Sequence, residues 1–134
     1  MNNFIADMIT RIRNGHRAKL KAILMHTYLP NFCIKILFLL KKEGFIRSFV
    51  WAYDPVSKNK IIKVYLKYDN NGLSVIKNIF VVSTRSKKIF ASVDALWKPK
   101  TFSGIFIIST PKGLMTDRTC RYFNIGGKVI CAVQ

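Results

Sequence analysis

Hydrophobic residues near the start of the chain recur at helical spacing. Residues three and four positions apart lie on one face of a helix, and the apolar positions that follow this rule are Ile5, Met8, Ile9 and Ile12. Asp7 and Arg11 are four residues apart on the other side, where they can form an ion pair. The turn formers Asn14-Gly15 predict the end of this first helix.

The next hydrophobic pattern predicts a strand, a second helix and a hairpin. Alternation over residues 21–29 indicates a short strand, and residues 32–42 indicate a helix that Gly44 follows. This helix is apolar nearly all round, which is typical of a helix buried on more than one side, by its own fold or by a protein neighbour. Residues 45–53 and 61–68 alternate with period two and predict a β-hairpin.

Four consecutive turn formers, Asp69-Asn70-Asn71-Gly72, mark the predicted boundary between two small lobes, residues 1–72 and 73–134. The second lobe is predicted to be rich in strands, with a helical turn near Asp94 and a short helix that begins after Thr116 and ends at Asn124. Its predicted strands cover residues 75–83, 89–92, 105–108 and 129–133. A helix–strand–helix–hairpin lobe followed by a mainly antiparallel β lobe with short helices predicts an α+β fold.

The second lobe contains one polar loop with chemistry of interest, between a buried strand and the short helix. Ser109-Thr110-Pro111-Lys112-Gly113 offers two hydroxyls, one cation and a glycine that lets the main chain approach a ligand. No histidine or carboxylate is placed to activate either hydroxyl, so neither is a competent nucleophile. The alternative interpretation is a plain polar turn before a capped helix.

The charge of the chain indicates the class of its partner. The chain has 23 Lys and Arg but 6 Asp and Glu, which gives a formal net charge of +17. Such a charge repels itself and favours a polyanionic partner, with nucleic acid as the first candidate and an anionic membrane surface as the second. The cations are spread over the whole chain instead of one tail. That distribution favours a folded protein embedded in nucleic acid.

Metal, cofactor and enzyme chemistry are all disfavoured. The chain has three cysteines, Cys33, Cys120 and Cys131, and no two of them are close in sequence. Their odd number argues against a disulfide framework and favours a reducing compartment. Together with His16 and His26 they do not have metal-ligand spacing. The six carboxylates are too scattered to form a catalytic pair. We therefore predict no enzyme, no metal, no cofactor and no small-molecule substrate.

A membrane-spanning segment is not predicted. The longest apolar run, residues 32–40, is about half the length that a spanning helix needs and contains Lys35. The N-terminus lacks a basic region followed by an apolar core, so no signal peptide is expected. A basic protein on a membrane surface, or another kind of RNA-binding module, is the alternative to the main hypothesis below.

Four blocks of the sequence resemble small-subunit ribosomal protein eight of the bacterial and organellar type. Their order and spacing agree with that family from residue 3 to the last residue. The blocks are residues 4–15 (FIADMITRIRNG), 41–46 (KKEGFI), 109–118 (STPKGLMTDR) and 125–131 (IGGKVIC).

The resemblance implies a structural constituent of the small ribosomal subunit. Such a protein binds the central domain of small-subunit rRNA directly, helps its assembly in translation, and has other small-subunit proteins as neighbours. Members bind mainly through the C-terminal lobe, residues 73–134 here, with a Ser-Thr loop in the RNA minor groove. By resemblance, the RNA-binding residues are Thr10, Arg11, Arg13, Arg85, Lys87, Lys88, Phe90, Ser109, Thr110, Lys112, Gly113 and Lys128.

The chain departs from the family pattern at several positions. Pro111 stands where a second serine is usual, and Phe90 replaces a tyrosine, so that stacking survives without the hydroxyl. Arg85-Ser86 replaces a Pro-Gly pair, and Lys128 replaces an acidic residue; both changes increase phosphate attraction. Gly104 is the remaining member of a glycine pair. These departures concern fine contacts to RNA and not overall binding.

Composition also suggests a compartment. Heavy use of lysine, isoleucine, phenylalanine and asparagine suggests an A/T-rich genome, as in many organelles. The matching block begins at residue 3, which leaves no room for a transit peptide. We therefore expect an organelle-encoded protein of the mitochondrial matrix, with the cytoplasm of an A/T-rich bacterium as the alternative.

Overall fold

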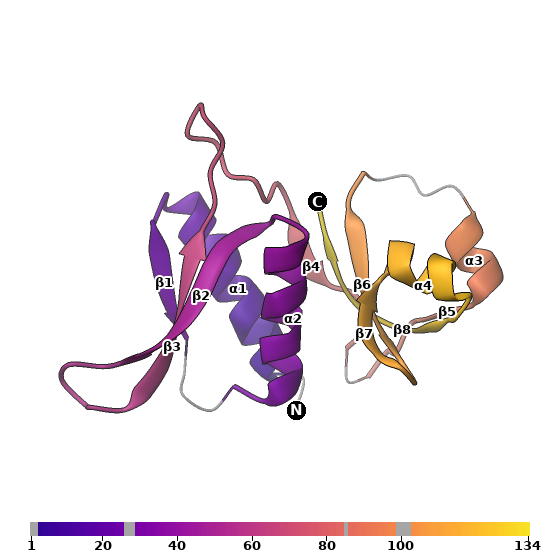
Figure 1. The fold of residues 1–134 in the computed structure, drawn as a ribbon, viewed down its shortest axis with the longest axis horizontal. Coiled ribbons are helices and arrows are strands. Elements are labelled where there is room, and N and C mark those ends of the chain that lie inside the picture. The colour runs from indigo at the N-terminus through magenta and orange to yellow at the C-terminus, as the bar shows by residue number, and fades with distance from the viewer. Residues whose placement is uncertain (1–2, 26–28, 85, 99–102) are drawn as a thin grey trace. The chain divides into compact units, whose positions relative to one another are not determined.

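The chain separates into two compact units, each with its own sheet (Figure 1). The computed structural model describes residues 3–25, 29–84, 86–98 and 103–134. The N-terminal unit extends to Ile76 and the C-terminal unit begins at Lys77. The turn that we predicted as the boundary, residues 69–72, therefore lies inside the N-terminal unit. Helices and antiparallel strands occur in both units, which confirms the α+β class.

The N-terminal unit has the predicted order of helix, strand, helix and hairpin. Its elements are α1 (Asn3–Arg17), β1 (Ala22–Met25), α2 (Asn31–Lys42), β2 (Ile46–Tyr53) and β3 (Lys60–Leu66). The sheet has the order β1-β3-β2 and is antiparallel throughout. The strand predicted over residues 21–29 is described over Ala22–Met25. Residues 26–28, which include His26, lie outside the described part.

Alternation along β3 sets the core of the N-terminal unit. Its inward residues are less than 4% exposed and face the helices: Ile62, Val64 and Leu66. The predicted apolar face of α1 meets them, because Ile5, Met8, Ile9 and Ile12 are all buried. Asp7 and Arg11 form the predicted pair on the outer side, with Arg11 Nε 3.1 Å from Asp7 Oδ2.

The end predicted for α1 at Asn14-Gly15 is wrong, since the helix continues to Arg17. A Cβ atom on Gly15 would lie 2.6 Å from Ile23 Cγ2, so this glycine permits close packing of the helix on β1. Lys19, two residues beyond the end of the helix, adopts a φ of 59°. Leu20 N–H bonds the Gly15 carbonyl at 3.0 Å and Lys19 N–H bonds the His16 carbonyl at 3.1 Å, the Schellman arrangement.

Helix α2 is buried along one stripe and not on several sides, so the expectation of deep burial within its own fold is wrong. The buried stripe consists of Cys33, Ile36, Leu37 and Leu40. Phe38 on the other side is 58% exposed, and its ring meets that of Phe49 edge-on with centroids 5.0 Å apart. Apolar composition overstated the burial because an exposed aromatic ring can pack sideways on a neighbouring strand.

The C-terminal unit is the strand-rich lobe of the prediction. Its elements are β4 (Ile79–Val81), β5 (Phe90–Ala91), α3 (Val93–Trp97), β6 (Ile105–Thr110), β7 (Gly113–Thr116), α4 (Asp117–Phe123) and β8 (Gly127–Val133). The sheet has the order β4-β8-β6-β7, and β5 also pairs with β8. All of these pairings are antiparallel. The closing strand β8 is therefore the strand on which three others depend.

Two local predictions in the C-terminal unit need correction. The strand predicted over residues 75–83 is reduced to Ile79–Val81. The predicted polar loop, residues 109–113, is mostly strand, because Ser109 and Thr110 end β6 and Gly113 begins β7. The connection between β6 and β7 is a two-residue turn. Only the pairing register of the two strands shows this, because the residue types alone also fit a longer loop. By contrast, Thr116 caps α4 as predicted, accepting from Thr119 N–H at 3.3 Å, and Asn124 ends it with a φ of 58°.

A compact apolar cluster lies between the C-terminal sheet and its helices. The fully buried members of this cluster are Leu96, Ile108, Met115, Cys120 and Val129. Paired residues in an antiparallel sheet point to the same face, and Ile108 pairs with both Met115 and Val129. This face of the sheet is therefore the core face, and the neighbouring positions in each strand point away from it.

Candidate nucleic-acid interface

Strand register brings together three predicted RNA-binding residues on one row of the C-terminal sheet. Phe90 pairs with Lys128, and Lys128 pairs with Ser109. Ser109 in turn pairs with Leu114. Each of these positions is adjacent in its strand to a residue of the core face or its border, so all four point outward. We call Phe90, Lys128, Ser109 and Leu114 the outer row.

The outer row presents three different chemistries side by side. Phe90 is 69% exposed, so most of its ring is free to contact a ligand. Lys128 and Ser109 are half-buried. The Ser109 hydroxyl has no hydrogen-bond partner among the described residues, so it can both donate and accept. Cross-strand neighbours have Cβ atoms about 5 Å apart, which places ring, ammonium and hydroxyl in one continuous strip.

Thr110 has a different role from Ser109. Successive residues of a strand point to opposite faces, and Thr110 is only 8% exposed. Its Oγ1 donates to the Gly113 carbonyl at 2.7 Å and accepts from Lys112 N–H at 3.2 Å. The two hydroxyls of the predicted contact loop therefore lie on opposite faces of the strand. Thr110 shapes the turn, and its proton is committed there.

The turn carries the predicted cation and glycine at its tip. Lys112 and Gly113 are both exposed, as is Pro111. Gly113 has a φ of 113°, a conformation that residues with a side chain rarely adopt. The structure therefore explains the glycine by backbone geometry and leaves the space above it open, since a Cβ there would meet nothing within 4 Å.

Two glycines within the block at residues 125–131 are essential to the row. A Cβ on Gly127 would lie 2.2 Å from the Ser109 carbonyl oxygen, and one on Gly126 would lie 2.5 Å from the Ala91 carbonyl oxygen. Both obstacles are backbone atoms, which cannot rotate away. Glycine pairs of this kind allow β5, β8 and β6 to lie close enough to form the strip.

A buried serine, also missed in the sequence, holds the basic turn that precedes β5. Ser83 is 7% exposed, and its Oγ donates to the Val129 carbonyl and accepts from Ile89 N–H at 2.9 Å. Thr84 N–H then bonds the Lys87 carbonyl at 2.8 Å to close the turn. A short polar residue at the end of an apolar run was the available signal. Because of this anchoring, Lys87 starts from a fixed backbone beside β8.

Several cations in the described part of the C-terminal unit face solvent, and cations outnumber acids in this unit. Residues 77–134 contain ten of the 23 Lys and Arg but two of the six acids, Asp94 and Asp117. Lys87, Lys88 and Lys112 are exposed, whereas Asp117 is 2% exposed. Arg85 is a predicted contact that lies outside the described residues. The exposed charge near the outer row is therefore positive, as a phosphate-binding surface requires.

Comparison with known proteins gives sequence matches over nearly the whole chain. The family model described as "Ribosomal protein S8" covers residues 3–134. The small ribosomal subunit protein uS8 of Orientia tsutsugamushi (strain Ikeda) is 43% identical over 135 residues, which cover 99% of this chain and 98% of that protein. The uS8 proteins of Kosmotoga olearia and Rickettsia akari are 42% and 40% identical over 96% and 99% of this chain, and over 96% and 98% of their own lengths.

The chain belongs to the ribosomal protein S8 family. This membership confirms the resemblance that the four sequence blocks indicated. The family is structural and non-enzymatic. The relatives named above are bacterial. The middle position of the outer row is a lysine in this chain, Lys128.

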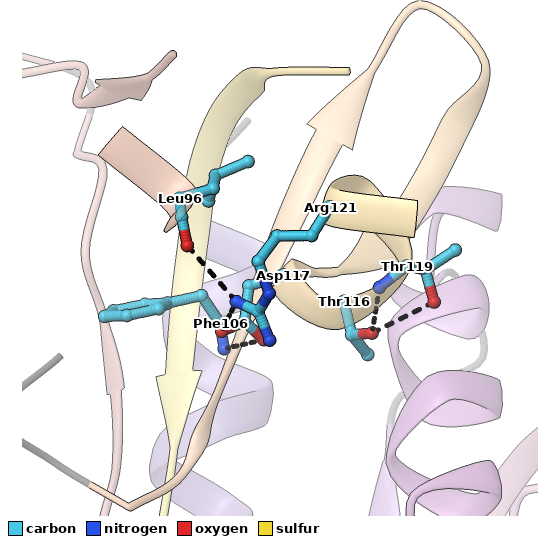
Figure 2. A network of polar contacts seen from close by, with 6 residues as sticks. All are labelled: Leu96, Phe106, Thr116, Asp117, Thr119 and Arg121. Carbon is cyan, nitrogen blue, oxygen red and sulfur yellow. Dashed lines mark hydrogen bonds and ion pairs between the residues drawn. The ribbon is translucent and has the colours of Figure 1, made fainter. Parts of the chain in front are cut away.

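The α4 helix of this S8 protein is fixed by a buried ion pair (Figure 2). Arg121 Nη1 lies 3.2 Å from Asp117 Oδ2 and donates to the Leu96 carbonyl at 3.4 Å. Phe106 N–H donates to Asp117 Oδ1 at 3.4 Å. Asp117 thus places a negative charge in the first turn of α4, and its contacts with Arg121 join α3, α4 and β6.

The predicted contacts of the opening helix belong to the N-terminal unit. Thr10 is exposed and Arg13 is half-buried. Arg11 is already engaged, since its guanidinium contacts Asp7 and donates from Nη1 to the Leu24 carbonyl at 3.3 Å. Arg11 therefore has a defined structural role in joining α1 to β1, besides any contact that it makes with phosphate.

The described residues contain no cluster of side chains that could hold a metal ion. Within them, no group of three His, Cys, Asp or Glu side chains converges on one point. The three cysteines are free and buried, and burial raises the pKa of Cys33 to about 11 and that of Cys131 to about 12. Such thiols stay protonated near neutral pH and are poor nucleophiles. Among the described helices, none is long and apolar enough to cross a membrane.

Proposed function

We propose that this protein is a structural constituent of the small ribosomal subunit that binds central-domain rRNA directly and helps its assembly. Binding runs mainly through the C-terminal unit, with other small-subunit proteins as neighbours. The observation that carries the proposal is the register of β5, β8 and β6, which sets an exposed ring, an ammonium and an unpaired hydroxyl in one strip: Phe90, Lys128 and Ser109. Membership in the S8 family supports it.

The chemistry of the outer row suits the minor groove of RNA. A-form RNA presents a wide, shallow minor groove lined by 2′-hydroxyl groups. The Ser109 hydroxyl can donate to one such group and accept from another, and Phe90 can pack on a base or a sugar. Lys128 and Lys112 attract the flanking phosphates, which adds affinity without sequence information. Ser109 therefore supplies the shape-dependent part of binding.

The remaining predicted residues act around this strip. Lys87 and Lys88 extend the phosphate contacts from the basic turn, and Arg85 belongs to the same proposal. Thr110 and Gly113 position the tip of the hairpin through their mutual hydrogen bond. In the N-terminal unit, Thr10 and Arg13 of α1 contact the RNA backbone together with Arg11. This division assigns recognition to the C-terminal unit and general attraction to both.

We further propose that the protein is encoded in an organelle and works in the mitochondrial matrix. The support is the heavy use of lysine, isoleucine, phenylalanine and asparagine, which fits an A/T-rich genome. The genetic code and genomic location of the gene test this point directly. A gene that uses the standard code on a bacterial chromosome would contradict it, in line with the bacterial relatives.

The binding proposal is tested with the full chain on two RNAs, a central-domain rRNA fragment and an unrelated duplex of equal length. We expect a clear preference for the first, and an affinity that falls about 10³-fold or more between 50 and 200 mM salt, because several phosphate contacts release counterions. Equal binding of the two RNAs would remove the specific site. A nearly flat salt profile, or preferential binding to anionic lipid vesicles, would remove the RNA hypothesis altogether.

A further inference from the structure

The β2–β3 hairpin of the N-terminal unit exposes two aromatic side chains that no structural need explains. Trp51 is 55% exposed and Tyr53 is 67% exposed. They are two positions apart in β2, so they point to the same face of the sheet. Phe49 lies on the same face of β2 and its ring meets that of Phe38 in α2, whereas Trp51 and Tyr53 stay largely exposed. The two rings therefore stand on a part of the hairpin that its helices leave open.

A hollow in the surface lies beside this pair. Its volume is about 310 Å³, and it is lined by Trp51, Ala52, Tyr53 and Lys60. Tyr53 pairs with Lys60 in the sheet, and Trp51 pairs with Ile62. An exposed aromatic wall and an ammonium group thus border the same space. A ligand with a flat aromatic ring and a neighbouring negative charge would match the aromatic wall and the ammonium group.

The connection at the tip of the hairpin is held in shape by an aspartate. Asp54 Oδ1 accepts from Val56 N–H at 3.0 Å, and Oδ2 accepts from Ser57 Oγ at 2.9 Å. Lys58 N–H also bonds the Asp54 carbonyl at 2.7 Å. The hollow is consequently backed by an ordered turn, so that little conformational freedom is lost when a ligand enters.

Charge identifies the class of ligand. Residues 47–67 contain five cations and one anion, and that anion, Asp54, has both carboxylate oxygens bonded within the turn. The cations are Arg47, Lys58, Lys60, Lys63 and Lys67. A protein surface could also pack on aromatic rings, but a polyanion satisfies the uncompensated charge as well. Unpaired RNA bases are commonly bound by stacking on aromatic side chains beside a cationic groove.

We propose that Trp51, Tyr53 and Lys60 form a stacking site for an unpaired nucleotide of RNA. The base stacks on the exposed rings, and Lys60 holds the adjoining phosphate. This site is separate from the outer row, and it reads single-stranded RNA while the outer row reads a helical groove. The inference rests on the proposed function, since it assumes that RNA is the partner of this protein.

Fluorescence tests the site, because the chain contains two tryptophans, Trp51 and Trp97. In a Trp97→Phe background Trp51 is the sole indole reporter. We expect a short single-stranded oligouridylate to quench its emission, and a blunt RNA duplex of the same length to do so far less. Trp51→Ala and Tyr53→Ala, each made in the full chain, should weaken binding of the oligouridylate about tenfold, the usual size of one lost stacking contact.

Val56→Ala is the matched control, since Val56 lies in the same hairpin, is 91% exposed and does not line the hollow. It should bind the oligouridylate like the unaltered chain. Circular dichroism should confirm that all variants fold, because each altered side chain is mostly outside the core. The aromatic variants should keep their affinity for central-domain rRNA that lacks unpaired nucleotides.

The results separate this inference from the proposed function. If Trp51 is not quenched, or if Trp51→Ala binds the oligouridylate like Val56→Ala while the chain still binds central-domain rRNA, the stacking site is wrong and its rings are a protein contact. If the chain binds neither RNA, the proposed function fails and the stacking site fails with it. Quenching with a tenfold loss in both aromatic variants supports the site.

Discussion

Each unit of the protein contains a helix with an aspartate four residues before an arginine, and the two pairs behave differently. In the N-terminal unit, Asp7 and Arg11 meet at 3.1 Å with side chains 54% and 40% exposed. In the C-terminal unit, Asp117 and Arg121 meet at 3.2 Å with side chains 2% and 25% exposed. The spacing, the residue types and the distance are the same. Only the surroundings differ.

The difference lies in what each pair connects. The exposed pair lies on the outer side of α1, where water screens the attraction. The buried pair joins the start of α4 to the Leu96 carbonyl of α3 and to the Phe106 amide of β6. It therefore holds β6, the strand that contains Ser109. The comparison indicates that polar groups in the C-terminal unit are used to fix the position of the outer row.

The largest effect is expected from a methyl group at Gly127. Gly127→Ala places a Cβ 2.2 Å from a backbone oxygen of Ser109, so β6 and β8 must separate, and we expect a loss of about 3 kcal/mol or more in unfolding free energy. Gly15→Ala in the N-terminal unit is the counterpart. Its nearest obstacles are the side-chain atoms Ile23 Cγ2 and Leu66 Cδ1 at 2.6 and 2.9 Å, which can shift, so a smaller loss is expected.

Urea unfolding distinguishes the two, because each unit contains one tryptophan. Trp51 reports on the N-terminal unit and Trp97 on the C-terminal unit, each in a background where the other is phenylalanine. Gly127→Ala should shift the Trp97 transition and Gly15→Ala the Trp51 transition. Equal losses for the two variants would mean that backbone approach at Gly127 is not special.

Removal of the carboxylate charges should give the next largest difference. Asp117→Asn leaves the buried side of Arg121 without its partner and should cost about 2 kcal/mol, less than a fully enclosed pair because Arg121 keeps some contact with water. Asp7→Asn should cost about 0.5 kcal/mol or less, as is usual for exposed helix pairs. The same two tryptophan reporters measure both. Similar losses of unfolding free energy for the two variants would mean that burial does not distinguish the two ion pairs.

A smaller effect is expected at the hairpin tip. Lys112→Gln should weaken binding of all RNAs by a similar factor and make the slope of log affinity against log salt shallower by about one unit, because one phosphate contact is lost. Lys67→Gln, an exposed lysine of the N-terminal unit, is the charge-matched control and should change the slope less. A selective loss on one RNA would show that Lys112 reads shape instead of charge.

The smallest effect concerns pH and belongs to the N-terminal unit. His16 is 4% exposed, its two ring nitrogens lack hydrogen-bond partners among the described residues, and burial lowers its pKa from 6.5. The folded state therefore resists protonation. Its stability should be complete above pH 6.5 and should fall as the pH drops toward the lower pKa of the folded state.

Unfolding followed by Trp51 between pH 7 and 5 should show this loss. His16→Phe removes the titrating group while keeping the edge-on ring contact with Tyr68, whose centroid lies 5.4 Å away, so the variant should be flatter over the same range. An unchanged pH profile in the variant would assign the loss to another group.

The sequence was sufficient for features that repeat along the chain. Helical spacing predicted the buried face of α1, which consists of Ile5, Met8, Ile9 and Ile12, and alternation predicted the β2–β3 hairpin. Both periods follow directly from local backbone geometry. Thr116 and Asn124 gave the ends of α4 for the same reason. Family resemblance, carried by contiguous blocks, indicated the partner class.

Features that depend on long-range register could not be predicted. Phe90, Lys128 and Ser109 are far apart in the sequence and become one row only when β5, β8 and β6 pair. The same pairing brings Gly127 against the Ser109 carbonyl, an approach that no local pattern in the sequence indicates. A two-residue turn moved Ser109 and Thr110 into a strand, which put their side chains on opposite faces.

The most direct test of the account is the loss of one hydroxyl from the outer row. Ser109→Ala should lower affinity for central-domain rRNA by on the order of 1 kcal/mol and leave an unrelated duplex nearly unaffected. Ser48→Ala is the matched control, since Ser48 is also a half-buried strand residue but lies in the N-terminal sheet opposite Tyr65. It should change neither affinity. If folded Ser109→Ala discriminates between the RNAs as well as Ser48→Ala does, the outer row does not read RNA and the β6–β7 connection is only a turn.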